Sequence, residues 1–183
     1  ARYESFSVNA GAEFYLLTRE LTRPEFEPLP VPVFMAGSGD DTTVNIEAAR
    51  EFFCSKAPVG PSRMLWYSAS ATGSDPVASC PGLQVIPAEA PEQRVYSLSH
   101  TSISVPPEDP HYGFDGAYSI CLHYGEGTPN FNSCVNDDAQ TVYGERNLGS
   151  EGHYEGKLIR RGSFNPHYAA MFAAIACFID GDC

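Results

Sequence analysis

The sequence lacks any apolar run long enough to cross a bilayer, and it contains few basic residues. Its longest apolar block, residues 168–179, is shorter than the roughly 18 to 20 residues that a spanning helix requires. There are 11 Lys and Arg against 23 Asp and Glu, which gives a formal net charge of -12. An acidic surface repels phosphate backbones and anionic lipids. We therefore expect no membrane span and no nucleic-acid partner.

The six cysteines include no C-x-x-C pair, which argues against a zinc ribbon or a redox-active dithiol. An even number of cysteines permits three disulfides. Short loops and elimination favour the pairs Cys121 with Cys134, Cys177 with Cys183, and Cys54 with Cys80. The alternative is that some of the six are buried free thiols, because cysteine is among the most buried residue types. If the disulfides form, the protein works outside the cytoplasm, in a secreted or periplasmic setting.

Length and composition are those of one globular domain: the chain has 183 residues, of which 43% are hydrophobic. Residues 2–4 do not resemble an export signal, and the chain does not begin with methionine. We expect that an upstream segment has been removed. No cofactor and no metal site are expected, because acidic pairs such as Asp137 with Asp138 lack the ligand spacing of a recognised calcium loop.

Helical spacing of apolar residues predicts three helices, and short apolar runs predict three strands. The helices are expected at residues 10–21, 45–56 and 165–180, and the strands at residues 31–36, 63–68 and 94–99. Asn165 is expected to cap the last helix, with Pro166 at its first position.

The first predicted strand is apolar throughout and leads through a glycine turn into an amphipathic helix, which is typical of a βαβ unit. The predicted fold class is therefore α/β with parallel strands. The parallel neighbour of the first strand is either residues 63–68 or residues 94–99. Residues 104–162 are dense in Pro, Gly, Asn, Asp and Tyr, which predicts a long loop-rich excursion that could behave as a cap.

Two turn residues carry the candidate chemistry. Asp41 follows the first predicted strand in a glycine-rich turn, and His100 follows the strand predicted at residues 94–99. Parallel strands bring their carboxyl ends to one edge of a sheet, so the acid and the imidazole are expected to meet over the tips of adjoining strands. A carboxylate that holds a histidine in one tautomer is what a triad hydrolase needs. Asp40 is the alternative acid, and His123 is the best alternative base.

Both candidates also have structural interpretations. An aspartate in a glycine turn before a helix commonly forms the turn or interacts with the helix amino terminus, as Asp41 would here. A histidine at the end of an apolar run, such as His100, can be a satisfied structural residue. The order of strand, turn and acid, followed later by the histidine, favours the chemical interpretation.

The acid turn reads V-P-V-F-M-A-G-S-G-D-D-T-T-V-N, and the histidine segment reads R-V-Y-S-L-S-H-T-S-I. Together with the last helix, residues 29–100 resemble the final third of the α/β-hydrolase fold, in particular its esterase and lipase-like members. These enzymes carry the acid after the seventh strand, in a pattern near G-x-x-D-x-x-V, and the histidine after the eighth. The resemblance implies that residues 1–183 are the carboxy-terminal part of such a domain, with Asp41 as the acid and His100 as the base.

The chain departs from that family in one large respect, because it contains no G-x-S-x-G motif. The strand-to-helix turn that exposes a serine nucleophile and forms half of the oxyanion hole is therefore absent. The resemblance implies a serine-type carboxylic ester hydrolase whose nucleophile lies in a missing or separate amino-terminal segment, acting on a small ester or lipid-like substrate. By itself the chain is expected to be nearly inert. The alternative is a non-catalytic, disulfide-stapled binding or interaction module derived from the same fold.

Overall fold

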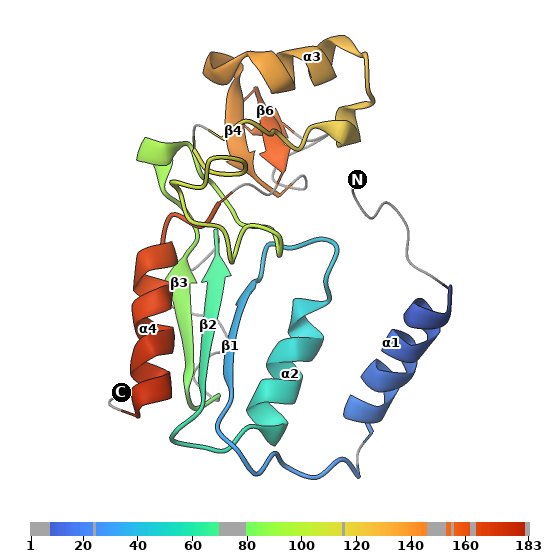
Figure 1. The fold of residues 1–183 in the computed structure, drawn as a ribbon, viewed down its shortest axis with the longest axis vertical. Helices are drawn as coiled ribbons and strands as arrows, with labels where there is room; N and C mark the ends of the chain where they lie inside the picture. Colours follow the sequence, from blue (N-terminus) through green and yellow to red (C-terminus); the bar gives the residue numbers. More distant parts are fainter. Residues whose placement is uncertain are drawn as a thin grey trace.

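The computed structural model describes residues 8–23, 25–69, 80–114, 116–145, 153–154, 156–161 and 164–181. These residues form a three-stranded parallel sheet flanked by helices, and a smaller three-stranded sheet beyond the carboxyl ends of its strands (Figure 1). The mixed α/β class predicted from the sequence is confirmed.

The larger sheet has the strand order β1-β2-β3, and all its strands run parallel. Its strands are β1 (Phe34–Ser38), β2 (Arg63–Ser68) and β3 (Leu83–Pro87). The central strand β2 is buried at every position after Arg63, because helices cover both faces of the sheet. Successive side chains of a strand point to opposite faces, so a strand covered on both faces needs a continuous apolar run.

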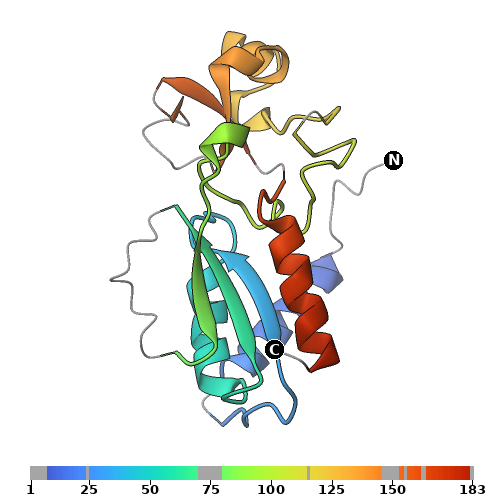
Figure 2. The same cartoon turned by 90° about the vertical axis from the view of Figure 1, so that its left-hand side faces the viewer.

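Helices of opposite direction to the strands cover the two faces of this sheet. The faces are covered by α2 (Ile46–Lys56) and α4 (Tyr168–Asp180), while α1 (Val8–Leu21) lies beyond α2 (Figure 1). Viewed along the sheet, α2 and α4 lie on opposite sides of the strands (Figure 2). The side chain of Asn45 caps α2 by accepting a hydrogen bond from the Ala48 N–H at 3.2 Å, and Gly181 ends α4 with a φ of 75°, a conformation that glycine adopts without strain.

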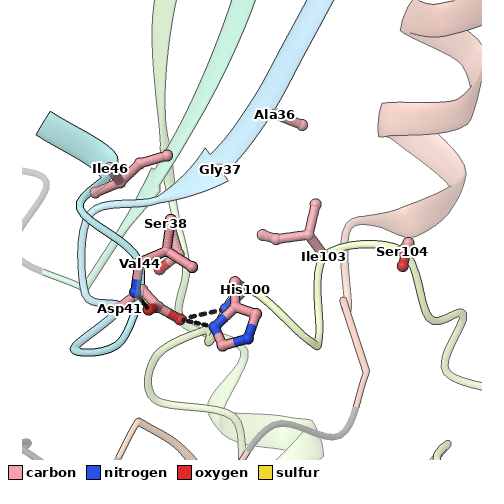
Figure 3. A pocket seen from close by; sticks show the side chains of 9 residues that line it. All are labelled: Ala36, Gly37, Ser38, Asp41, Val44, Ile46, His100, Ile103 and Ser104. Atoms are coloured by element: carbon pink, nitrogen blue, oxygen red, sulfur yellow. Dashed lines mark hydrogen bonds and ion pairs between the residues drawn. The ribbon is translucent and has the colours of Figure 1, made fainter. Parts of the chain in front are cut away.

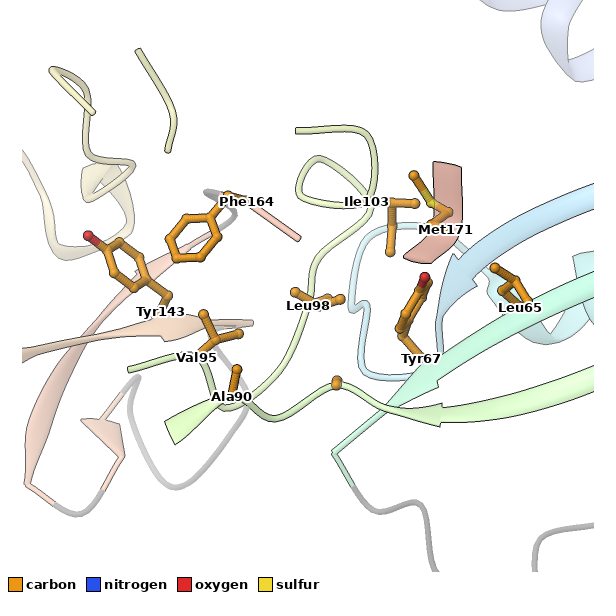
Figure 4. Packing of buried hydrophobic residues seen from close by; sticks show 10 residues of the cluster. Leu65, Tyr67, Ala90, Val95, Leu98, Ile103, Tyr143, Phe164 and Met171 are labelled. Carbon is orange, nitrogen blue, oxygen red and sulfur yellow. The ribbon is translucent and has the colours of Figure 1, made fainter. Parts of the chain in front are cut away.

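The core is divided by the sheet. On the α2 face, Met64 and Trp66 of β2 pack with Phe53. On the α4 face, Leu65 and Tyr67 pack in a second cluster that continues past the strand tips toward the smaller sheet (Figure 4). That second cluster joins residues of both sheets, and its buried members are Leu65, Tyr67, Ala88, Ala90, Val95, Leu98, Ile103, Tyr143, Phe164 and Met171.

The prediction of a strand at residues 94–99 is wrong, and the third strand is β3, which the sequence analysis missed. The 94–99 segment is extended but forms only isolated bridges, through Val95 to Ala90 and to Tyr143. The segment is apolar enough to resemble a strand because Val95 and Leu98 enter the core. The parallel neighbour of β1 is therefore β2, the first of the two alternatives.

The last helix begins later than predicted. It starts at Tyr168, after the turn formed by Pro166 and His167. Asn165 does not cap it: its side-chain oxygen accepts from the His167 N–H at 2.9 Å, and its amide donates to the Ile103 carbonyl at 3.1 Å. The buried Asn165 side chain thus ties the start of the helix to the loop after His100.

The predicted excursion at residues 104–162 contains a small sheet of its own, with the order β4-β6-β5. Its elements are η3 (Leu122–Tyr124), α3 (Pro129–Asn136), η4 (Asp138–Gln140), β4 (Thr141–Gly144), β5 (His153–Tyr154) and β6 (Lys157–Arg161). Strand β4 pairs parallel with β6, and β5 pairs antiparallel. This region forms a folded lobe on the carboxyl side of the larger sheet (Figure 1), and its short strands and helices were not predicted from the sequence.

Two of the three predicted disulfides are present. Cys54 on α2 bonds to Cys80 ahead of β3, and Cys121 bonds to Cys134 on α3. Cys177 is also disulfide-bonded, whereas Cys183, its predicted partner, lies outside the described residues. Within the described part of the chain, no helix has both the length and the apolar character needed to cross a bilayer.

Candidate functional site

The acid turn is built directly on the end of β1. Gly39 continues the ladder by donating its N–H to the Tyr67 carbonyl at 2.8 Å, after which the chain turns toward α2. The Asp41 carboxylate closes this turn, because its Oδ1 accepts from the N–H groups of Thr43 at 2.7 Å and Val44 at 2.6 Å. Aspartate is favoured at such positions because its short side chain reaches the backbone two and three residues on.

The histidine arrives from β3 by a crossing segment, and it does not directly follow a strand that pairs with β1. Residues 88–99 run from the end of β3 back over the sheet, and the buried Ser38 hydroxyl of β1 donates to the Leu98 carbonyl at 2.6 Å. This bond brings the segment to the tip of β1. The prediction that the two groups follow adjoining strands is therefore wrong, because the histidine segment comes from β3 and β2 lies between β1 and β3.

Asp41 and His100 are nevertheless in contact. The Asp41 Oδ2 atom lies 2.7 Å from His100 Nδ1, and it also accepts from the His100 backbone N–H at 2.5 Å (Figure 3). Two donors on one residue converge on one oxygen, which fixes both the position of His100 and the orientation of its ring. The Asp41 side chain is 1% exposed, while the His100 side chain is 37% exposed. The acid is enclosed and the ring is open to solvent.

Hydrogen bonding keeps this acid ionised. Burial alone would raise the pKa of Asp41, but the bonds from the Val44 and His100 N–H groups, the His100 ring and the Thr43 N–H together hold its pKa below the ordinary value of 3.8. An ionised carboxylate only accepts hydrogen bonds, so Nδ1 of His100 must be the donor. A neutral His100 therefore carries its lone pair on Nε2, the state in which a histidine acts as a general base.

The neighbouring Asp40 is held apart from the histidine. Its carboxylate accepts from the Ala69 N–H at 2.9 Å and lies 3.4 Å from the Ser68 hydroxyl, at the end of β2. Burial raises its pKa to about 6, although these hydrogen bonds oppose the shift. Of the two candidate acids, Asp41 is the one that contacts His100.

A pocket opens beside the pair at the tip of β1. Its volume is about 250 Å³, and it is lined by Ala36, Gly37, Ser38, Asp41, Val44, Ile46, His100, Ile103 and Ser104 (Figure 3). The pocket is small against the roughly 300–1,000 Å³ of ordinary ligand sites. Its floor is the outer edge of β1, which places the His100 ring beside a strand that has no described neighbour on that side.

A series of hydrogen bonds connects the smaller sheet to the site, and the sequence did not predict it. Arg161 donates to the Thr43 hydroxyl in the acid turn and pairs with the buried Glu145 at 2.8 Å. The Glu145 N–H in turn donates to the Ser97 hydroxyl at 2.7 Å, close to the histidine. The smaller sheet thus contacts the supports of both Asp41 and His100. No sequence spacing indicates this link, since Thr43 and Arg161 are far apart in the chain.

The competing histidines lie elsewhere. His123 packs against Tyr124 in the smaller lobe, with tilted rings whose centroids are 4.1 Å apart. His111 is exposed and stacks on Tyr118. His167 is half-buried against Tyr67 at the start of α4.

No nucleophile accompanies the pair in the described part of the chain. Within it, the His100 ring is hydrogen-bonded to Asp41 alone. Of the two serines that line the pocket, Ser38 is buried and bonded to Leu98, and Ser104 lies on the far side of Ile103 (Figure 3). The described residues also contain no cluster of three or more His, Cys, Asp or Glu that could hold a metal ion.

Comparison with known proteins adds no assignment, because no family model, no curated protein and no solved structure matches the chain.

Proposed function

We propose that this chain supplies the acid and the base of a serine-type carboxylic ester hydrolase, as the carboxy-terminal part of an α/β-hydrolase domain. The observation that carries the proposal is the 2.7 Å bond between Asp41 Oδ2 and His100 Nδ1, at the carboxyl edge of a parallel sheet. Sites of open α/β sheets form at that edge. The substrate class is a small or lipid-like ester, and the protein would act outside the cytoplasm, in keeping with its disulfides.

In the proposed reaction, His100 Nε2 takes the proton of a serine hydroxyl that attacks the ester carbonyl carbon. The resulting imidazolium then gives that proton to the leaving alcohol, and water resolves the acyl-enzyme by the same steps. Asp41 holds the Nδ1 proton and stabilises the imidazolium through its enclosed, ionised carboxylate. The serine and the oxyanion donors belong to a segment outside this sequence, which has no G-x-S-x-G motif.

The test uses the polypeptide expressed from the complete natural coding sequence. A fluorophosphonate probe should label one serine upstream of Ala1, and His100→Ala should abolish both the labelling and the hydrolysis of a short-chain nitrophenyl ester. A loss of about 10³-fold or more is expected, the range seen when a triad member is removed. The matched control is His111→Ala, because His111 is an exposed histidine that does not line the pocket.

Two results would reject the proposal. One is unchanged ester hydrolysis in His100→Ala with the wild-type melting temperature. The other is the absence of any labelled serine in a folded, disulfide-bonded preparation. Either would leave a disulfide-stapled interaction module as the better description of the chain.

A further inference from the structure

The outer edge of β1 has the character of an internal strand. Hydrogen bonds from Arg63 N–H to the Val33 carbonyl and from Gly39 N–H to the Tyr67 carbonyl show that odd-numbered positions face β2. In a parallel ladder the alternate positions face the other way, so the N–H groups of Phe34 and Ala36 point to the free edge. The strand reads F-M-A-G-S and carries none of the charges or prolines that protect natural sheet edges.

The opposite edge of the same sheet is different. Met64 N–H donates to the Gly82 carbonyl and Ala88 N–H donates to the Ser68 carbonyl, so even-numbered positions of β3 face β2. Pro87 therefore directs its missing N–H outward, as expected for a strand that ends a sheet. By this comparison β3 is built as an edge and β1 is not.

Helix α1 stands beyond this open edge with its apolar residues uncovered. None of its 14 residues is buried, and Phe14 is 70% exposed, Tyr15 61% and Leu17 55%. In Figure 1 it lies on the β1 side of the larger sheet, beyond α2, and Leu21 near its carboxyl end lines a common pocket with Phe52 of α2. An isolated helix of this length is marginal in water, so it needs a surface to cover.

The direction of α1 indicates which surface it would cover. The helix runs opposite to β1 and leads into it through residues 22–33 (Figure 1). A strand followed by such a helix and then by β1 would be a βαβ unit, whose two strands are parallel and whose crossover is right-handed. The β1-α2-β2 unit obeys the same rule and moves away from the open edge. The preceding strand would therefore pair with the open edge of β1.

We infer that the open edge of β1 and the apolar side of α1 receive one further parallel strand, from the polypeptide on the amino-terminal side of α1. The strand would be uncharged and apolar, because neither β1 nor the exposed Phe14, Tyr15 and Leu17 offers it a charge. Its carboxyl end would come to the pocket formed by Ala36 and His100.

The experiment compares amide exchange by NMR in this chain and in the same chain extended at its amino terminus by the natural upstream sequence. The amides of Phe34 and Ala36 should exchange slower by roughly tenfold or more in the extended protein, as a new hydrogen bond predicts. The Met35 amide faces β2 and should be protected in both. The extended protein should also show slower exchange in α1.

A pair of proline variants gives the control. Ala36→Pro removes an outward N–H from β1 without touching its bonds to β2, and should return the Phe34 amide and α1 to fast exchange. Val85→Pro removes an outward N–H from the other edge and should leave both unchanged. Three results would overturn the inference: unchanged exchange in the extended protein, equal protection in a symmetric dimer of this chain found by sedimentation, or a natural polypeptide with no residues before Ala1.

Strand docking and ester hydrolysis are separable in this design. Protection of Phe34 and Ala36 without fluorophosphonate labelling would keep the docked strand and reject the hydrolase. Labelling that depends on His100, without protection of the β1 edge, would keep the hydrolase and reject the docked strand.

Discussion

The two sheets of this protein are held together by different forces. The larger sheet has apolar clusters on both faces, with Phe53 and Met64 on one and Leu65 and Tyr67 on the other. The smaller sheet contributes Tyr143 to the second of these clusters, and it has a small cluster of its own that is built on the Cys121–Cys134 disulfide. A lobe too small for a large apolar core therefore depends on covalent and polar restraints.

Arg160 is the clearest polar restraint of the smaller lobe. Its guanidinium is almost fully buried and donates to the Cys134 carbonyl at 2.8 Å and the Val135 carbonyl at 3.2 Å, and it pairs with Asp138 at 2.5 Å. These bonds tie β6 to the end of α3. A rigid guanidinium suits this role because its donors point in fixed directions.

The first prediction concerns the apolar core of the larger sheet and has the largest expected effect. Phe53→Ala removes a side chain that is 2% exposed between α2 and the larger sheet, and should lower the free energy of unfolding by about 3–5 kcal/mol. Chemical denaturation measures the loss. Phe172→Ala on α4 is the control, because that side chain is 59% exposed and should change stability by about 0.5 kcal/mol or less. Equal losses of unfolding free energy in the two variants would show that the burial of Phe53 does not contribute to stability.

The second prediction concerns the disulfide that stabilises the smaller sheet. Replacing Cys121 and Cys134 together by alanine should cost about 2–4 kcal/mol, concentrated in the smaller sheet. Amide exchange should accelerate at Val142 and Ile159, while Leu65 in the larger sheet changes little. Replacement of Cys54 and Cys80 is the matched control, and should reverse this order. Uniform acceleration in both sheets would mean that the two lobes unfold as one unit.

The third prediction concerns how stability depends on pH through Asp40, and it has the smallest expected effect. The folded-state pKa of Asp40, about 6, lies above its ordinary value of 3.8, so the folded protein binds an extra proton between these pH values. Stability from this group is therefore lost as pH rises from about 4 to about 6, by about 1–2 kcal/mol after allowance for solvent screening.

The variant Asp40→Asn tests the sign, because asparagine keeps an acceptor for the Ala69 N–H but does not titrate. Its stability relative to wild type, from denaturation curves at several pH values, should increase across that range. Asp41 acts in the opposite direction. Because its pKa is lowered in the folded state, it stabilises the fold at pH values above the ordinary pKa of an aspartate, and this contribution is lost as the pH falls below that value. A stability difference that does not vary with pH would contradict the assignment to Asp40.

Several features of the fold and the candidate site could be predicted from local pattern. The strand Arg63–Ser68 and the helix after Asn45 follow the run lengths and cap chemistry of the sequence. The disulfides Cys54–Cys80 and Cys121–Cys134 follow from spacing and elimination. The approach of Asp41 to His100 follows from their turn positions, although their catalytic role stays a prediction.

Other features escaped the sequence for identifiable reasons. Strand β3 is only five residues long and includes Gln84 and Pro87, so its pattern is weak. The segment around Val95 and Leu98 has the apolar residues of a short strand because these side chains enter the core, and a short apolar run does not distinguish a paired strand from an extended crossing. The smaller sheet has short strands whose polar contacts leave no periodic signal.

By itself the sequence determined the elements and the chemistry that local interactions control: which runs are apolar, which residues cap and turn, and that an aspartate and a histidine stand in turns. Only the tertiary structure decided the route of the chain to His100, the choice of Asp41 over Asp40, and the contact of Arg161 with Thr43. These depend on contacts between residues distant in sequence. Such contacts are set by how the sheets pack, which no local pattern encodes.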